Sequence, residues 1–93
     1  MRRFFNIYNT NIESSNSFQT IQNTREDIIG ELEAIIQYDN HLKQTTDASA
    51  KETIQDIMME EMLHVGQLFG LLFSLDNDSK VQFEKGLKEF KNE

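Results

Sequence analysis

The chain has 93 residues, 38% of them hydrophobic, with no proline, no cysteine and four glycines. This length fits one small domain, the missing cysteines exclude disulfides, zinc ribbons and thiol chemistry, and the scarcity of turn-forming residues argues against a β-sandwich or barrel. Sixteen acidic residues against nine basic ones give a formal net charge of −7, which disfavours nucleic acid as a partner and favours cations.

The hydropathy of the sequence indicates in which compartment the chain is expected. No apolar run approaches the roughly 20 residues of a membrane span, and the first residues lack the apolar stretch of a secretory signal. We therefore expect no membrane partner and a cytoplasmic location.

The first 17 residues are rich in Asn, Ser and Thr, with four apolar residues near the front: Phe4, Phe5, Ile7 and Tyr8. Such a composition is typical of an irregular segment that is either disordered or docked on a partner subunit. We predict an irregular N-terminal arm over residues 1–17 and a helical domain over residues 18–93.

The first helix is clear from Thr24, because acidic residues fill the turn that follows, where the helix dipole favours them. It can begin as early as Ser17 and continues to about Gln44. Thr45, Thr46 and Asp47 then interrupt the pattern.

The second helix begins with a capping box, Ser49-Ala-Lys-Glu52, and runs to about Leu75. Asp78 is a candidate N-cap for a shorter third helix over about residues 79–90. The pattern predicts an all-α fold: an antiparallel two-helix hairpin followed by a short C-terminal helix.

Both long helices carry an apolar line with alternating spacings of three and four, which we call the seam. This spacing keeps side chains on the buried side of a helical bundle. In the first helix the seam is Ile21, Thr24, Ile28, Glu31, Ile35, Tyr38 and Leu42. In the second helix it is Ile54, Ile57, Glu61, His64, Leu68, Leu71 and Leu75.

An antiparallel hairpin brings the polar positions of the two seams together. With Thr46 at the centre of the turn, residues whose numbers add to 92 lie at the same height. Glu31 then faces Glu61, while Ile28 faces His64.

Two ionised carboxylates at one buried level need a shared proton, a cationic partner or a metal ion. No Lys or Arg lies on either seam near this level. Glu61 and His64 are three residues apart and project from one face of the helix. Oxygen donors with one imidazole suit iron or manganese, and zinc is a further candidate. The alternative is a metal-free polar layer that fixes the register of the helices.

One Glu and one Glu-x-x-His make half of a di-iron carboxylate site, since such bundles take one Glu from each of two helices and Glu-x-x-His from each of the other two. A two-fold dimer would duplicate each ligand and supply the other half. A second apolar stripe on the same helix also favours subunit contacts: Met58, Met62, Val65, Phe69 and Leu72.

At the stretches Gly30-Glu-Leu-Glu-Ala-Ile-Ile-Gln-Tyr-Asp39 and Met59-Glu-Glu-Met-Leu-His64, the sequence resembles the ferritin-like superfamily, above all the two-helix encapsulated ferritins and the short rubrerythrin-like proteins. The similarity extends over about residues 24–90. It implies dimerisation into a ferritin-like four-helix bundle and a ferroxidase that oxidises ferrous iron for storage or detoxification.

The same resemblance implies the site residues. Glu31, Glu61 and His64 would bind iron at the dimer interface, two ions per dimer, with Tyr38 beside them as a further catalytic residue. Zinc, manganese or calcium would substitute for iron.

Members of this family also form rings of dimers such as decamers, housed inside an encapsulin shell. Two features depart from the family pattern. Gly30 stands where encapsulated ferritins often carry an acidic residue, and the C-terminus holds no clear docking peptide of the Gly-Ser-Leu type. An encapsulin shell is therefore expected from the resemblance alone.

Two alternative functions remain open. The first is a rubrerythrin-like peroxide reductase, which would need an outside electron donor because the chain has no cysteines for a rubredoxin-type iron. The second is a non-catalytic helical oligomerisation module that uses the polar layer for specificity only. Metal analysis of the purified protein separates the second from the others.

Overall fold

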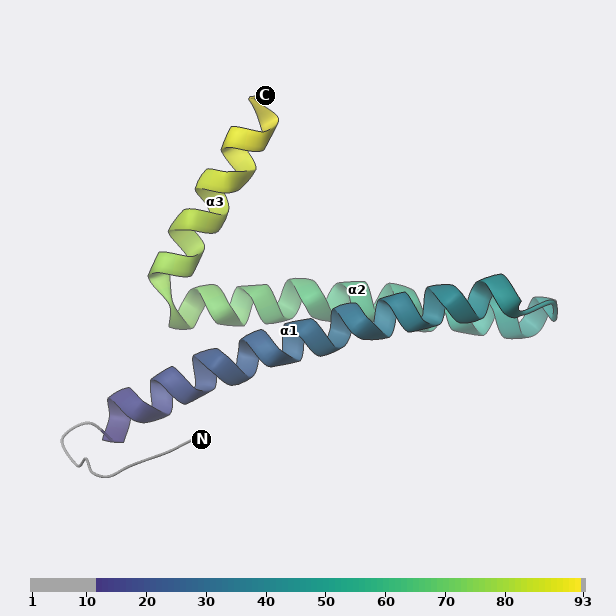
Figure 1. Cartoon of the computed structure of the whole chain (residues 1–93), viewed down its shortest axis with the longest axis horizontal. Coiled ribbons are helices and arrows are strands. Elements are labelled where there is room, and N and C mark those ends of the chain that lie inside the picture. Colours follow the sequence, from purple (N-terminus) through teal and green to yellow (C-terminus); the bar gives the residue numbers. More distant parts are fainter. Residues whose placement is uncertain (1–11, 93) are drawn as a thin grey trace.

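The computed structural model describes residues 12–92 of the chain. They form three helices, α1 (Ile12–Gln44), α2 (Ala48–Leu75) and α3 (Asn77–Lys91). The predicted all-α fold with a long hairpin and a short C-terminal helix is therefore confirmed (Figure 1).

Helix α1 begins at Ile12, inside the segment predicted to be irregular. Most of residues 12–23 are polar, which lowers the helical signal, but they contain no Gly or Pro to stop a helix that is established further along the chain. The remainder of the predicted arm, residues 1–11, lies outside the described residues.

Residues 45–47 connect α1 to α2, so the turn is centred on Thr46 as predicted. The cap differs from the prediction. The carboxylate of Asp47 accepts a hydrogen bond from the backbone N–H of Ala50 at 2.8 Å, which makes Asp47 the N-cap and places Ser49 inside the helix. A short acidic side chain at this position satisfies one of the free N–H groups of the first turn.

The hairpin core is thin. Among the residues whose burial is described, Thr24, Ile28 and Leu72 are buried. The hydroxyl of Thr24 donates to the carbonyl of Thr20 at 2.7 Å, so this polar group is satisfied inside the core.

Helix α2 is rotated relative to the predicted seam. Leu72, from the second stripe, is only 5% exposed, whereas Leu71 and Leu75, from the seam, are 44% and 37% exposed. One member of the second stripe, Leu72, is therefore buried within the single chain.

Helix α3 leaves the end of the hairpin at a steep angle (Figure 1). Asp76 forms the corner and is the N-cap residue by its extended backbone, so α3 starts two residues earlier than predicted and Asp78 lies in its first turn. Phe83 anchors the helix against α2, with its ring centroid 5.1 Å from that of Phe69 and 5.0 Å from that of Phe73.

A second anchor joins the corner to α1. The guanidinium of Arg25 donates to the carboxylate of Asp76 at 2.9 Å and to the hydroxyl of Ser79 at 3.1 Å. Among the three described helices, the backbone of α3 otherwise approaches only that of α2.

The chain is extended, with a radius of gyration of 18.0 Å and a smallest dimension of 16 Å. A compact domain of this length would have a radius of gyration of about 12 Å. None of the described helices is long and apolar enough to cross a membrane.

Candidate metal centre

Three potential metal ligands meet near the middle of the hairpin. Glu31 comes from α1, and Glu61 and His64 come from α2 one turn apart. One ligand atom from each residue lies within 4.8 Å of the others. The predicted register, which set Glu31 opposite Glu61, therefore brings these three side chains together as expected.

A single imidazole nitrogen lies between the two carboxylates. The Nδ1–H of His64 donates to Oε1 of Glu61 at 3.0 Å, and the same nitrogen is 3.6 Å from Oε2 of Glu31. Within residues 17–92, no Lys or Arg forms an ion pair with either carboxylate. Within this described range, His64 is thus the one side-chain nitrogen partner of the two acidic groups.

The cluster lies at the edge of the hairpin interface and not deep inside it. The side chains of Glu61, Glu31 and His64 are 18%, 26% and 45% exposed. Ile28, one turn from Glu31, is buried. The carboxylates are therefore partly withdrawn from water on one side and open to a cation or a second chain on the other.

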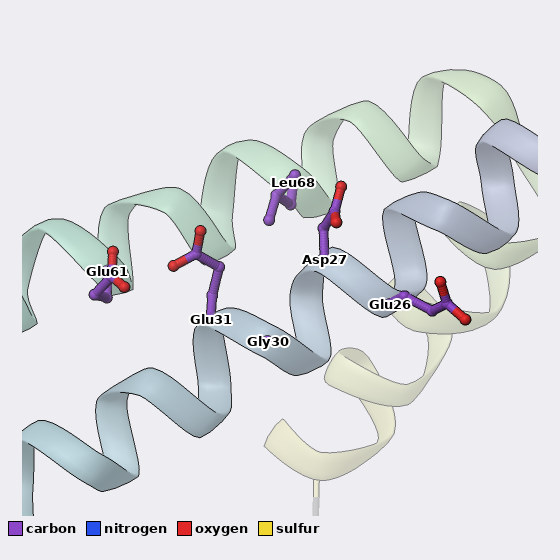
Figure 2. A pocket seen from close by; sticks show the side chains of 6 residues that line it. All are labelled: Glu26, Asp27, Gly30, Glu31, Glu61 and Leu68. Carbon is purple, nitrogen blue, oxygen red and sulfur yellow. The ribbon is translucent and has the colours of Figure 1, made fainter.

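An open depression adjoins the cluster, lined by Glu26, Asp27, Gly30, Glu31, Glu61 and Leu68. Figure 2 shows Glu31 and Asp27 reaching from α1 toward α2, where Glu61 and Leu68 lie. A Cβ atom built on Gly30 would meet nothing within 4 Å, so the depression is open at this point.

Asp27 and Glu26 are the acidic lining residues that the sequence reasoning missed. The spacing contained a signal for Asp27, because it precedes Glu31 by four residues and so lies on the same side of α1. Asp27 lies off the apolar seam, so the seam pattern alone does not single it out.

Tyr38 does not join the cluster. It follows Glu31 by seven residues, which separates the two by about 10 Å along the helix axis. Its ring makes an edge-on contact with the ring of His41, with centroids 6.3 Å apart. In the described part of the chain, Tyr38 forms no hydrogen bond with Glu31, Glu61 or His64 and no ring contact with His64.

The donor set suits a divalent transition metal. Two carboxylates and one imidazole match the preferences of iron and manganese, and zinc also accepts them. Three protein ligands leave coordination positions open for a substrate or for further ligands. The hydrogen bond between His64 and Glu61 holds both side chains near the position that a cation would occupy.

Comparison with known proteins gives two related matches. The chain is 33% identical over 64 residues to a ferritin-like-encapsulin shell fusion protein of Pyrococcus furiosus. The match covers 69% of this chain but only 19% of that longer protein. The crystal structure of the encapsulated ferritin domain from Pyrococcus furiosus superposes with a TM-score of 0.78 and 25% identity, covering 99% of this chain and 87% of that one. No family model matches the sequence.

Proposed function

The chain is a homologue of the encapsulated ferritin domain, and from that premise we propose that it is a ferroxidase that takes ferrous iron as its substrate. The observation that carries the proposal is the convergence of Glu31, Glu61 and His64 within 4.8 Å on a hairpin of this fold. The three residues supply two anionic oxygen donors and one nitrogen donor to the ion.

A second copy of the chain completes the site in this proposal. Glu31, Glu61 and His64 make up half of the ligand set of a di-iron site. A second copy related by a two-fold axis beside the cluster would supply the same three residues again. Leu71 and Leu75 follow His64 by seven and eleven residues, so they lie on the same line of α2, and both are exposed. These leucines give the second copy an apolar surface next to the ligands.

The carboxylates favour the oxidised ion. Two ferrous ions per dimer give up one electron each, and dioxygen takes both electrons with two protons and leaves as hydrogen peroxide. The charge of each ion rises from +2 to +3, so its attraction to Glu31 and Glu61 grows in proportion. Neither carboxylate has a Lys or Arg partner in the described chain, so no such side chain competes with the ion for its negative charge.

The central test is oxidation of ferrous iron in air, followed by ferric absorbance and by dioxygen consumption. Glu61→Ala should lower the rate to that of iron in buffer, whereas Glu60→Ala, at the neighbouring exposed position, should keep the wild-type rate. A wild-type rate for Glu61→Ala, or a wild type no faster than buffer, would refute the proposal.

The role of Tyr38 is a separate part of the proposal. A phenol near the site can donate a hydrogen bond or an electron, and Tyr38 lies too far along α1 to be a ligand. Tyr38→Phe should therefore keep the full iron content and slow the oxidation. If the variant oxidises iron at the wild-type rate, Tyr38 serves only in packing.

We also propose an encapsulin shell as a partner, with the chain acting inside such a compartment. The support is the name of the relative, in which a ferritin-like part and an encapsulin shell share one polypeptide. Co-expression with an encapsulin shell should give particles that contain this chain. Empty shells beside free chain would argue against the partnership.

A further inference from the structure

A single residue separates α2 from α3. Asp76 has an extended backbone, with φ −139° and ψ 97°, between two helical segments. Its N–H still donates to the carbonyl of Leu72 at 2.8 Å, and its carbonyl accepts from the N–H of Lys80 at 3.3 Å. Both bonds join residues four apart, as in a helix. A return of the Asp76 torsions to helical values of about −63° and −42° would therefore join the two helices.

The sequence at the corner weakens a helix without ending it. Residues 71–85 contain no Gly and no Pro, the two residues that interrupt helices most strongly. Residues 76–79 are Asp, Asn, Asp and Ser, which have low helix propensity but are tolerated inside helices. Nothing in the covalent chain therefore forces the corner to be bent.

The side-chain pattern also continues across the corner. This spacing of three and four residues marks one face of a single helix. One such line passes from α2 into α3 and is apolar except at its third and fourth members: Phe69, Leu72, Asp76, Ser79, Phe83, Leu87 and Phe90. The pattern thus fits one continuous helix as well as two.

An aromatic contact holds the bent form. The ring of Phe83 lies 5.1 Å from that of Phe69 and 5.0 Å from that of Phe73, measured between centroids. In a continuous helix Phe83 and Phe73, ten residues apart, would be separated by about 15 Å along the axis. The contact between these rings is therefore specific to the bent chain.

We propose that Asp76 is a hinge and that Phe83 is its lock. When the ring of Phe83 leaves Phe69 and Phe73, α2 and α3 extend into one helix over residues 48–91. The bent and straight chains are the two states of one element, and a partner that covers Phe69 and Phe73 in place of Phe83 would favour the straight state.

The hinge is separate from the proposed iron site. Arg25 tethers the hinge residue to α1, since its guanidinium donates to Asp76 at 2.9 Å and to Ser79 at 3.1 Å. None of the residues at the hinge or in its aromatic lock is one of the three candidate metal ligands. Loss of iron binding would therefore leave this proposal standing.

A distance within one chain tests the hinge. The chain has no cysteine, so Asp56→Cys and Lys88→Cys, at two exposed positions, would accept spin labels at these sites alone. The two residues are about 48 Å apart along the axis of a continuous helix and closer in the bent chain, where α3 turns away from the line of α2 (Figure 1). Double electron–electron resonance on labelled chain diluted with unlabelled chain measures this distance.

The labelled chain without further substitution should give the short distance. Phe83→Ala should raise the ratio of straight to bent chains by at least about tenfold, because it removes both aromatic contacts. Phe83→Ala with Asp76→Ala, which also places the best helix former at the hinge, should give the long distance as its main peak. Phe90→Ala is the matched control, since Phe90 lies on the same line of α3 and is 80% exposed, and it should keep the short distance.

Circular dichroism separates straightening of the hinge from melting of α3. The double variant should keep or exceed the helicity of the wild type, because residue 76 becomes helical and no helix is lost. A double variant that keeps the short distance would overturn the proposal, and so would a longer distance accompanied by a loss of helicity. A long distance in Phe90→Ala would also overturn it, since the lock would then not be Phe83.

Discussion

Glu31 and Glu61 lie at one level of the hairpin, and His64 lies beside both of them. Two unit charges about 4 Å apart repel by about 4 kcal/mol at an effective dielectric constant near 20, and no Lys or Arg in the described chain offsets this repulsion. A divalent cation would remove the repulsion and satisfy the imidazole at once. The electrostatics of the three residues thus favour a bound ion over an empty site.

The two histidines of the chain provide a matched test of the ligand assignment. His64→Ala should remove most of the binding of anaerobic ferrous iron, because it deletes the one nitrogen donor of the cluster. His41→Ala should bind iron normally, since His41 is exposed and contacts Tyr38 and not the cluster. Isothermal titration calorimetry measures both, and similar affinities for the two variants would show that the ligand set is wrong.

The meeting of Glu31, Glu61 and His64 could be predicted because their positions follow from helix geometry. An i, i+3 pair on α2 and the symmetry of a short turn determine where Glu31, Glu61 and His64 meet. Tyr38 could not be placed by the same reasoning, because spacing along a seam says which face a residue occupies and not what its ring contacts. Its contact with His41 depends on the side-chain conformation of both residues.

At the level of the helices, the start of α2 depends on one side chain. The carboxylate of Asp47 accepts from the N–H of Ala50, and removal of such a cap costs about 0.5–2 kcal/mol of unfolding free energy. Asp47→Ala should lower the stability in urea by about 1 kcal/mol. Ser49→Ala should change it much less, because Ser49 lies within the helix. Equal losses of stability in the two variants would instead support the capping box at Ser49 that the sequence predicts.

The corner between α2 and α3 should be sensitive to acid. The hydroxyl of Ser79, which donates to Asp76 at 2.6 Å, and then the charge of Arg25 lower the pKa of the Asp76 carboxyl below 3.8. A carboxylate whose pKa is lower in the folded state contributes stability that is complete above its unfolded pKa and is lost as the pH falls through the folded value.

The wild type should therefore melt a few degrees above Asp76→Asn at pH 6, and the difference should shrink steadily below about pH 4. Thermal melts of both proteins across this range make the comparison, and other carboxyl groups cancel because both proteins contain them. A difference that is the same at pH 6 and pH 2.5 would mean that the ion pair does not hold the corner.

The helix boundaries show which parts of the fold the sequence determines locally. The hairpin turn was predictable because Thr45, Thr46 and Asp47 interrupt two strongly periodic segments. The start of α1 at Ile12 and the rotation of α2 toward Leu72 were not, because they depend on how the helices pack. Two apolar stripes on one helix leave its rotation undecided until the partner helix is known.

For the whole molecule, the extended shape and thin core indicate that a single copy leaves much of its apolar surface in water. Few residues are buried, and large side chains on all three helices are exposed. A chain of 93 residues has a small core even when compact, so association with further copies is the expected source of additional stability.

The central claim is that one iron site is shared between two copies of the chain. Crystals grown anaerobically with ferrous iron and measured at the iron absorption edge test it most directly. The account predicts two anomalous peaks per pair of chains, each within ligand distance of Glu31, Glu61 or His64 from both copies. Peaks bound by the residues of one copy only, or peaks located away from these three residues, would contradict it.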